Sequence, residues 1–272
     1  MSKLPIALQL YSVRQEIMND PEGTLSAVAD MGYEGVELAG FGPYDAAGMQ
    51  TALLKRGLTP VSAHIPLGEM ITDPQGVLGV YAAMGCGYVA IPHLGEPDRP
   101  GGANFAHTLA AIQTVGAAAA ALGMQLLYHN HDFEMQLLEG ETLLDRLYRI
   151  TDPALLAAQP DVCWLQVGGE DPAAFVTRYA GRVPLVHLKN YAGGKTAHMY
   201  DLIGLAPGQD APEQKPFEMR PLGDGLVNIA AVVAAAEQAG TRWLVVEQDT
   251  PTPGKTALQC AKESIDYLHT LA

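Results

Sequence analysis

The stretch Tyr128-His129-Asn130-His131-Asp132-Phe133-Glu134 places two histidines, an asparagine and two carboxylates directly after an apolar run. If residues 126–131 form a β-strand, His129 and His131 point the same way, because side chains alternate between the two faces of a strand. Two imidazoles on one face at the end of a strand are suited to bind a metal ion or to transfer protons. We therefore predict a functional site here. The competing interpretation is a solvated strand end whose histidines bond to the backbone.

Polar side chains also stand at the ends of the other apolar runs. They are Gln9 and Tyr11, Glu37, His64, His93, Asp161, His187 with Lys189, and Glu247. Five of the eight histidines thus follow an apolar run, whereas His107, His198 and His269 fall elsewhere. Imidazoles and carboxylates that converge on one point suit a borderline divalent cation such as Mn²⁺, Co²⁺ or Zn²⁺. Such a cation can hold a hydroxyl and a carbonyl of a substrate and stabilise a developing enolate.

The chain that positions these residues alternates short apolar runs with helical patterns. The predicted strands cover residues 5–11, 35–40, 58–65, 88–92, 126–131, 157–165, 183–189 and 242–247. The predicted helices cover residues 21–31, 46–56, 73–84, 104–122, 141–150, 171–179, 227–239 and 255–271. Alternation of this kind requires parallel strands with crossover helices. Eight such units predict an α/β fold, a (β/α)8 TIM barrel that spans residues 1–272 as a single domain.

A doubly wound open sheet is the main alternative fold, but no GxGxxG turn follows the first strand. In a barrel the active site lies at the C-terminal ends of the strands, where the polar residues described above would meet. Individual residues keep simpler interpretations. Asp161 is also suited to cap a loop, and His64 or His93 to bond a neighbouring loop. Lys189 is suited equally to bind a substrate oxyanion or to pair with a carboxylate on the next strand.

Composition excludes several classes of function. The chain has 30 acidic and 16 basic residues, a formal net charge of -14, and contains no basic run. Such a surface repels nucleic acid. We find no signal peptide and no apolar segment long enough to span a bilayer, and the three cysteines have no metal-binding or disulfide spacing. We therefore expect a cytoplasmic protein with no nucleic-acid or membrane partner. A homo-oligomer is compatible with the sequence, which does not fix the oligomeric state.

Five segments resemble the sugar phosphate isomerase/epimerase family, whose members are xylose-isomerase-like TIM barrels. They are ALQLYSVR in the first strand region, YHNHDFE in the fifth, PDVCWLQVGGEDP in the sixth, VHLKN in the seventh and VVEQD in the eighth. The segments span nearly the whole chain in the family's order. The resemblance implies a divalent metal (Mn, Co, Zn or Mg) held by residues from strands five to eight. Three of these ligands fall on Asp161, His187 and Glu247.

The resemblance also has departures. Many relatives carry a glutamate at the end of strand five, where this chain has His129 and His131. We expect His129 to be the fourth metal ligand and His131 to act in catalysis; the alternatives are His131 as the fourth ligand, or three protein ligands and a water. In 3-epimerases of this superfamily, paired glutamates of strands five and eight transfer the protons, so the loss of one favours one-base chemistry or a histidine acid. The strand-seven motif commonly reads HLKD, and here it ends in Asn190.

The family comparison predicts an enzyme that binds a sugar-like, polyhydroxylated carbonyl compound. The predicted catalytic residues are Glu247, His131 and Lys189, and the predicted substrate contacts are Gln9, Glu37, His64, His93 and Trp164. The predicted metal ligands are His129, Asp161, His187 and Glu247. We expect isomerisation or epimerisation through proton transfer next to the carbonyl. The alternatives are a metal-dependent dehydratase or lyase on a keto-sugar or keto-inositol, whose relatives share the histidine-rich strand five, and a non-catalytic sugar-binding barrel.

Overall fold

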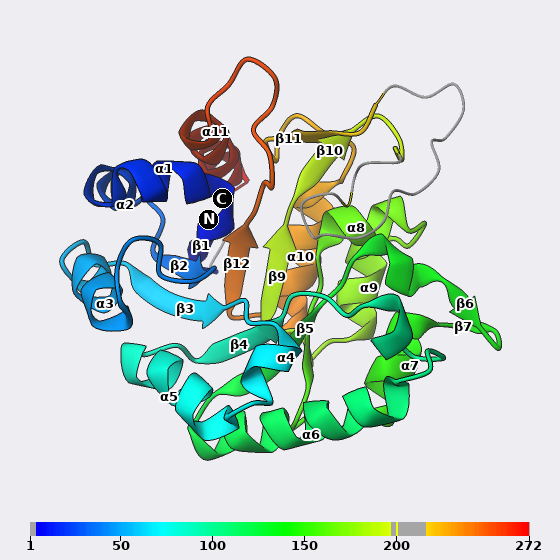
Figure 1. Cartoon of the computed structure of the whole chain (residues 1–272). Helices are drawn as coiled ribbons and strands as arrows, with labels where there is room; N and C mark the ends of the chain where they lie inside the picture. Colours follow the sequence, from blue (N-terminus) through cyan, green and yellow to red (C-terminus); the bar gives the residue numbers. More distant parts are fainter. Residues whose placement is uncertain (1–3, 197–199, 201–215, 272) are drawn as a thin grey trace.

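The computed structural model describes residues 4–196, 200 and 216–271, and eight parallel strands of this part of the chain form a barrel (Figure 1). They are β1 (Ile6–Gln9), β2 (Gly35–Leu38), β3 (Thr59–Ala63), β4 (Tyr88–Ile91), β5 (Gln125–His129), β8 (Ala157–Gln159), β9 (Leu185–Leu188) and β12 (Trp243–Val246). One sheet has the order β3-β2-β1-β12-β9 and the other β4-β5-β8. Single bridges from His64 to Ala90 and from Asp161 to His187 join the sheets and close the barrel. The predicted TIM barrel is confirmed.

Helices follow the strands and cover the outside of the barrel (Figure 1). They are α2 (Pro21–Asp30), α3 (Ala46–Leu54), α5 (Pro74–Met84), α6 (Phe105–Ala121), α7 (Leu143–Ile150), α9 (Pro172–Arg178), α10 (Ile229–Ala239) and α11 (Ala257–Thr270). Asp20, Asp73 and Asp171 each accept a backbone N–H of the following helix, and a proline opens that helix. An aspartate cap followed by proline is a strong start signal. The predicted ends of these three helices accordingly agree to within one residue.

Short elements that the sequence pattern did not predict surround the carboxyl ends of the strands. They are α1 (Arg14–Asn19), α4 (Leu67–Met70), α8 (Val162–Val167), the 3₁₀ turns η1 (Leu10–Val13), η2 (Glu96–Asp98) and η3 (Asp132–Met135), and the antiparallel pairs β6 (Leu137–Leu138) with β7 (Glu141–Thr142) and β10 (Asn190–Ala192) with β11 (Glu218–Arg220). The last pair lies in the predicted connection 190–224. Residues 197–199 and 201–215 of that connection, with His198, lie outside the described residues.

The inside of the barrel is built in layers. One layer consists of small and medium apolar side chains from seven strands: Ala7, Val61, Ala90, Leu127, Ala157, Leu185 and Val245. Because side chains on a strand alternate with a period of two, the residue two positions further along also faces inward. On five of these strands that next residue is polar: Gln9, His129, Gln159, His187 and Glu247. A polar layer therefore rests on an apolar floor at the C-terminal end of the barrel.

Every predicted strand ends at least one residue earlier than expected, and two of these early ends affect the site. β8 stops at Gln159, because Pro160 has no N–H and Asp161 caps α8, so residues 162–165 are helical rather than extended. Trp164 consequently lies on a helix at the rim of the barrel. β5 stops at His129, two residues before the predicted end. His131 precedes η3, although its backbone is still extended, with φ -111° and ψ -173°.

Candidate metal centre and active-site cavity

A cavity of about 340 Å³ opens at the carboxyl ends of the strands. It is lined by Tyr11, Ala39, His64, Pro92, His93, His129, His131, Trp164, Lys189, Tyr200, Glu247 and Asp249. Most of these residues belong to strand ends that the sequence singled out as candidates. The cavity therefore lies where a barrel of this kind carries its active site.

Four side chains at the floor of the cavity bring their donor atoms together. One ligand atom from each of His129, Asp161, His187 and Glu247 lies within 4.8 Å of the others, and all four residues are buried. They come from β5, the end of β8, β9 and the end of β12. Two imidazole nitrogens and two carboxylate oxygens at this spacing form a donor set that suits Mn²⁺, Co²⁺ or Zn²⁺.

Asp161 combines both interpretations that its sequence position allowed. Its Oδ1 caps α8 by accepting the N–H groups of Cys163 and Trp164 at 2.9 and 3.1 Å. Its own N–H donates to Asn130 Oδ1 at 3.0 Å, which fixes the turn. Oδ2 is buried and accepts no hydrogen bond from the described residues. Burial raises the pKa of this carboxyl. One oxygen is thus structural, and the other faces a cation, because Lys189 Nζ lies 3.0 Å from Oδ2.

His187 lies between two carboxylates. Its Nε2 is 2.6 Å from Glu37 Oε2, and its Nδ1 is 2.9 Å from Glu247 Oε2. Burial alone lowers the pKa of His187, but the two carboxylates outweigh it and raise the pKa to about 10. For Glu247 burial acts in the opposite direction and would raise the pKa. Lys189 and His187 outweigh it and hold the pKa of Glu247 well below its usual value. Either nitrogen of His187 can bind a metal while the other keeps a carboxylate partner, the usual arrangement for a ligating histidine.

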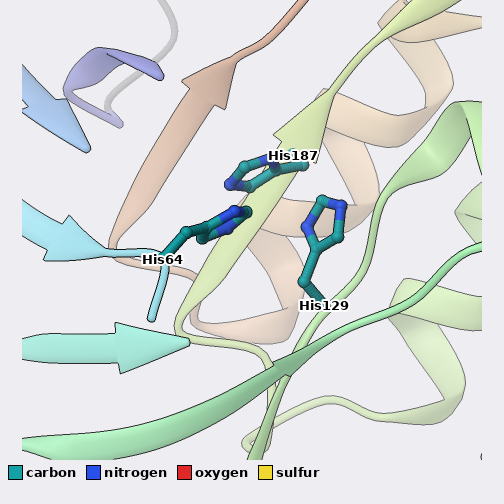
Figure 2. A group of neighbouring side chains, drawn as sticks. All are labelled: His64, His129 and His187. Atoms are coloured by element: carbon teal, nitrogen blue, oxygen red, sulfur yellow. The ribbon is translucent and has the colours of Figure 1, made fainter. Parts of the chain in front are cut away.

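His64, His129 and His187 form a second group of close donor atoms (Figure 2). The rings of His64 and His187 are stacked with their centroids 5.2 Å apart, and the ring of His129 stands edge-on to both. However, His64 Nε2 already lies 2.9 Å from Gln159 Oε1 and 3.1 Å from Glu37 Oε2. The group with Asp161 and Glu247 offers the negative charge that a divalent cation needs, so it is the better site.

Glu37 and Gln9 lie beneath the cavity and do not line it. Glu37 is fully buried and accepts hydrogen bonds from Gln9 Nε2 at 2.7 Å and Gln159 Nε2 at 2.6 Å, besides its contacts with His64 and His187. Direct substrate contact, which the sequence predicted for both residues, does not agree with this position. The sequence predicted that these two side chains stand at strand ends facing the site, but not how far below the cavity they lie. In this structure they support the histidines from below.

Lys189 has a buried ammonium group surrounded by carboxylates. Its Nζ lies 3.0 Å from Asp161 Oδ2, 2.9 Å from Glu247 Oε2 and 3.1 Å from Asp249 Oδ1. Burial lowers the pKa of a lysine, but these three carboxylates outweigh it and raise the pKa of Lys189 well above its usual value. The ammonium therefore remains charged beside the candidate metal ligands.

The opposite side of the cavity carries neutral rings. The ring of His131 is stacked between Phe133 and Trp164, with centroid distances of 5.1 and 5.3 Å. Burial lowers the pKa values of His129 and His131 well below the usual range, and burial and Arg99 lower that of His93. The imidazoles on this side are accordingly uncharged at neutral pH.

A buried carboxyl holds the backbone of His131. Glu134 Oε2 accepts the His131 N–H at 2.8 Å, and Glu134 Oε1 accepts the Tyr128 hydroxyl at 2.6 Å. Burial raises the pKa of Glu134 to about 8. Glu134 does not line the cavity, so its place is behind the histidines rather than against a substrate.

The sequence of this chain is similar to those of a known protein family. The sequence model of the xylose isomerase-like TIM barrel matches residues 25–271. The chain belongs to this family. The inosose dehydratase of Geobacillus kaustophilus (strain HTA426) is 27% identical over 285 residues, which covers 91% of this chain and 88% of the relative. The prediction of a xylose isomerase-like enzyme is thereby confirmed.

Solved structures of low sequence identity share the fold. A sugar phosphate isomerase/epimerase from Parabacteroides distasonis ATCC 8503 superposes with a TM-score of 0.78 at 20% identity, covering 98% of each chain. A xylose isomerase-like TIM barrel protein from Mycobacterium smegmatis, solved in complex with magnesium, superposes with a TM-score of 0.69 at 15% identity, covering 99% of this chain and 96% of that one. Among the described residues of this family member, no helix is long and apolar enough to cross a membrane.

The structure brings most of the predicted site residues together, and it adds others. His64, His93, His129, His131, Trp164, Lys189 and Glu247 line one cavity, with Asp161 and His187 at its floor. Sequence reasoning missed Asp249, two residues beyond Glu247 and on the same side of that strand end. The VVEQD motif contains it, and a period of two could have identified it. It also missed Tyr200, which lies in a connection without periodic pattern.

Proposed function

We propose that this protein is a metal-dependent dehydratase that removes water from a keto-inositol or a similar polyhydroxylated ketone. The observation that carries the proposal is the asymmetry of the cavity. Its lining carboxylates, Glu247 and Asp249, both follow β12, whereas the end of β5 presents the imidazoles of His129 and His131. Proton transfer between two opposed carboxylates would need a carboxylate at the end of β5, where the cavity has imidazoles instead. The similarity to inosose dehydratase supports the same reaction class.

His129, Asp161, His187 and Glu247 would hold the divalent cation. The donor set is the observation that fits such an ion, since two buried imidazoles and two buried carboxylates place one ligand atom each within 4.8 Å of the others. When bound, the cation would supply a Lewis acid for a carbonyl and a hydroxyl of the substrate. Beneath it, Glu37 would keep His187 oriented through its Nε2.

His131 would carry the proton. It is outside the metal group, lines the cavity, and is fixed in orientation by the rings of Phe133 and Trp164. A neutral imidazole takes the proton from the carbon next to the carbonyl, and the electron pair of that C–H bond forms the enolate. The imidazolium then returns the proton to the hydroxyl on the next carbon. That C–O bond breaks and water leaves.

Other lining residues would position the substrate. The Lys189 ammonium would bind an oxygen of the substrate that becomes negative as the proton leaves. The indole of Trp164, which stacks on Phe217 and on His131 and lines the cavity, would bound the substrate on that side. His64 and His93 would donate or accept hydrogen bonds with hydroxyl groups. No arginine is among the described residues that line the cavity, which favours an unphosphorylated substrate.

Mass spectrometry of the product tests the proposal. The Mn²⁺-loaded protein is incubated with a keto-inositol (inosose) in D₂O. A product lighter than the substrate by one water is expected. A product of unchanged composition apart from deuterium would overturn dehydration in favour of isomerisation or epimerisation.

Isomerisation or epimerisation is the second candidate function, and one observation favours it. Glu247 lines the cavity, and Lys189 and His187 keep its pKa well below the usual value, so a carboxylate base is present on one side. This reaction would proceed through one base with His131 as the partner. With Glu247 as the base, His131→Asn should retain deuterium exchange at the carbon next to the carbonyl, whereas dehydration through His131 predicts that His131→Asn abolishes it.

A further inference from the structure

The ammonium of Lys189 occupies the oxygens that a metal would use. Asp161 Oδ1 is committed to the N–H groups of Cys163 and Trp164, so only Oδ2 remains for a cation, and Lys189 Nζ lies 3.0 Å from it. Lys189 Nζ also lies 2.9 Å from Glu247 Oε2, the oxygen that contacts His187. Both contacts join the lysine to members of the four-residue metal group.

Asp249 is the third carboxylate on this ammonium, and it stands outside the metal group. Its Oδ1 and Oδ2 lie 3.1 and 3.3 Å from Lys189 Nζ. The backbone around it is held in place, because Arg14 donates to the Asp249 carbonyl at 2.8 Å and the Gln248 N–H donates to Ser12 Oγ at 3.0 Å. Asp249 therefore offers Lys189 a fixed acceptor that binding of a metal leaves available.

We propose that Lys189 acts as an internal cation that competes with the metal for Asp161 and Glu247, and that Asp249 is the positioning residue that draws it aside. This inference rests on the metal site of the proposed function. A divalent cation and an ammonium repel each other, and both require the same oxygens in a buried setting where charge interactions are poorly screened. In the metal-free protein, the ammonium compensates the buried charges of Asp161, Glu247 and Asp249, and it thereby lowers the affinity for the metal.

Titration of the chelator-treated full chain with Mn²⁺, followed by electron paramagnetic resonance of the free ion, measures the competition. Lys189→Met should lower the Mn²⁺ dissociation constant about tenfold, and Asp249→Asn should raise it about tenfold, because the lysine is then left to Asp161 and Glu247. Because Lys189→Met leaves buried carboxylates without their cation, Asp249→Asn provides an independent test in a protein that retains it. Lys195→Met is the matched control, since Lys195 pairs with Asp132, 2.6 Å away and outside the metal group.

The double variant separates this effect from the general charge of Asp249. In the Lys189→Met background, Asp249→Asn should change the constant by less than about threefold, because no ammonium remains to be positioned. The inference is overturned if Lys189→Met leaves the Mn²⁺ dissociation constant unchanged, or if Asp249→Asn still raises it about tenfold in the Lys189→Met background. In either case Asp161→Ala should still weaken Mn²⁺ binding. Mn²⁺ binding that Asp161→Ala leaves unchanged overturns the proposed metal site itself.

Discussion

The two sides of the cavity differ in charge. On the side of β8, β9 and β12, Asp161, Glu247 and Asp249 surround the ammonium of Lys189, and every one of these groups has a charged partner within 3.1 Å. On the side of β4 and β5, His93 and His131 are neutral, and their Nδ1 atoms have no hydrogen-bond partner among the described residues. Both sides stand on the same barrel floor.

This difference separates two chemical tasks. A cation needs fixed negative charge, and the charged side supplies it with side chains whose positions are set by several ion pairs. Proton transfer from carbon needs an unprotonated group that is free to accept a proton, which a neutral imidazole without an ion-pair partner offers and a carboxylate held between cations does not. We therefore expect variants of the charged side to change metal affinity, and variants of the neutral side to change turnover.

The largest effect is expected from His131→Asn. Loss of the proton carrier should lower kcat about a thousandfold, within the usual range for a general base, while the Mn²⁺ dissociation constant stays the same. Steady-state kinetics with a keto-inositol and Mn²⁺ titration measure the two quantities. His107→Asn, on the exposed face of α6, is the control. A kcat within about threefold of the unaltered protein would assign the proton transfer to another residue.

Asp161→Asn should weaken metal binding about a hundredfold, since removal of even an outer partner costs about 10- to 100-fold. Asparagine can still cap α8 through its side-chain oxygen, so thermal stability should change little. Asp161→Ala should lose the same affinity and about 1 kcal/mol of stability in addition, because the Cys163 and Trp164 N–H groups lose their acceptor. Equal Mn²⁺ affinity in Asp161→Asn and the unaltered protein would remove Asp161 from the metal site.

Glu134→Gln should change the pH dependence of stability on the neutral side. The folded-state pKa of Glu134 is raised from 4.5 to about 8, so the folded protein binds one proton more than the unfolded chain between these values. The stability that this proton contributes is full below 4.5 and is lost as the pH rises through 8. From pH 5.5 to 7.5, ionisation of Glu134 alone should lower the free energy of unfolding by about 2 kcal/mol.

Urea unfolding at several pH values measures this loss, which Glu134→Gln should remove. Glutamine can still accept the His131 N–H through its side-chain oxygen, so the comparison isolates the ionisation. An identical pH slope in both proteins would show that Glu134 does not titrate in this window.

The smallest effect is expected for a charge pair outside the cavity. Lys262 and Asp266 lie one turn apart on α11, with Nζ 2.5 Å from Oδ2, and both side chains are about half exposed. Lys262→Ala should change the free energy of unfolding by less than about 0.5 kcal/mol. A loss of several kcal/mol in urea unfolding would show that exposed pairs also hold this fold together, and that the buried side of the cavity is not distinctive.

The sequence predicts the barrel well because its signals are periodic. The eight apolar runs, the Asp-Pro helix starts and the glycines Gly85 and Gly240, which end α5 and α10 in the left-handed conformation, are all local. The candidate site follows from them, since polar residues at strand ends must meet in a parallel barrel. His129, Asp161, His187 and Glu247 were all predicted as metal ligands, and their roles stay predictions until a metal is measured.

The errors arise where non-local contacts decide. Whether Glu37 lines the cavity or lies beneath it depends on its hydrogen bonds to Gln9 and Gln159, from strands far apart in the sequence. Trp164 was expected on a strand, but the cap formed by Asp161 turns that segment into α8. The pairing of Lys189 with Asp249 bridges 60 residues and has no signature in either local motif.

Anomalous X-ray diffraction from a crystal grown with Mn²⁺ tests the division of the cavity most directly. A single peak bound by His129, Asp161, His187 and Glu247, with His131 free of the ion, is the expected result. A peak bound by His64, His129 and His187 without either carboxylate, or one bound by His131, would contradict the assignment of metal binding to the charged side.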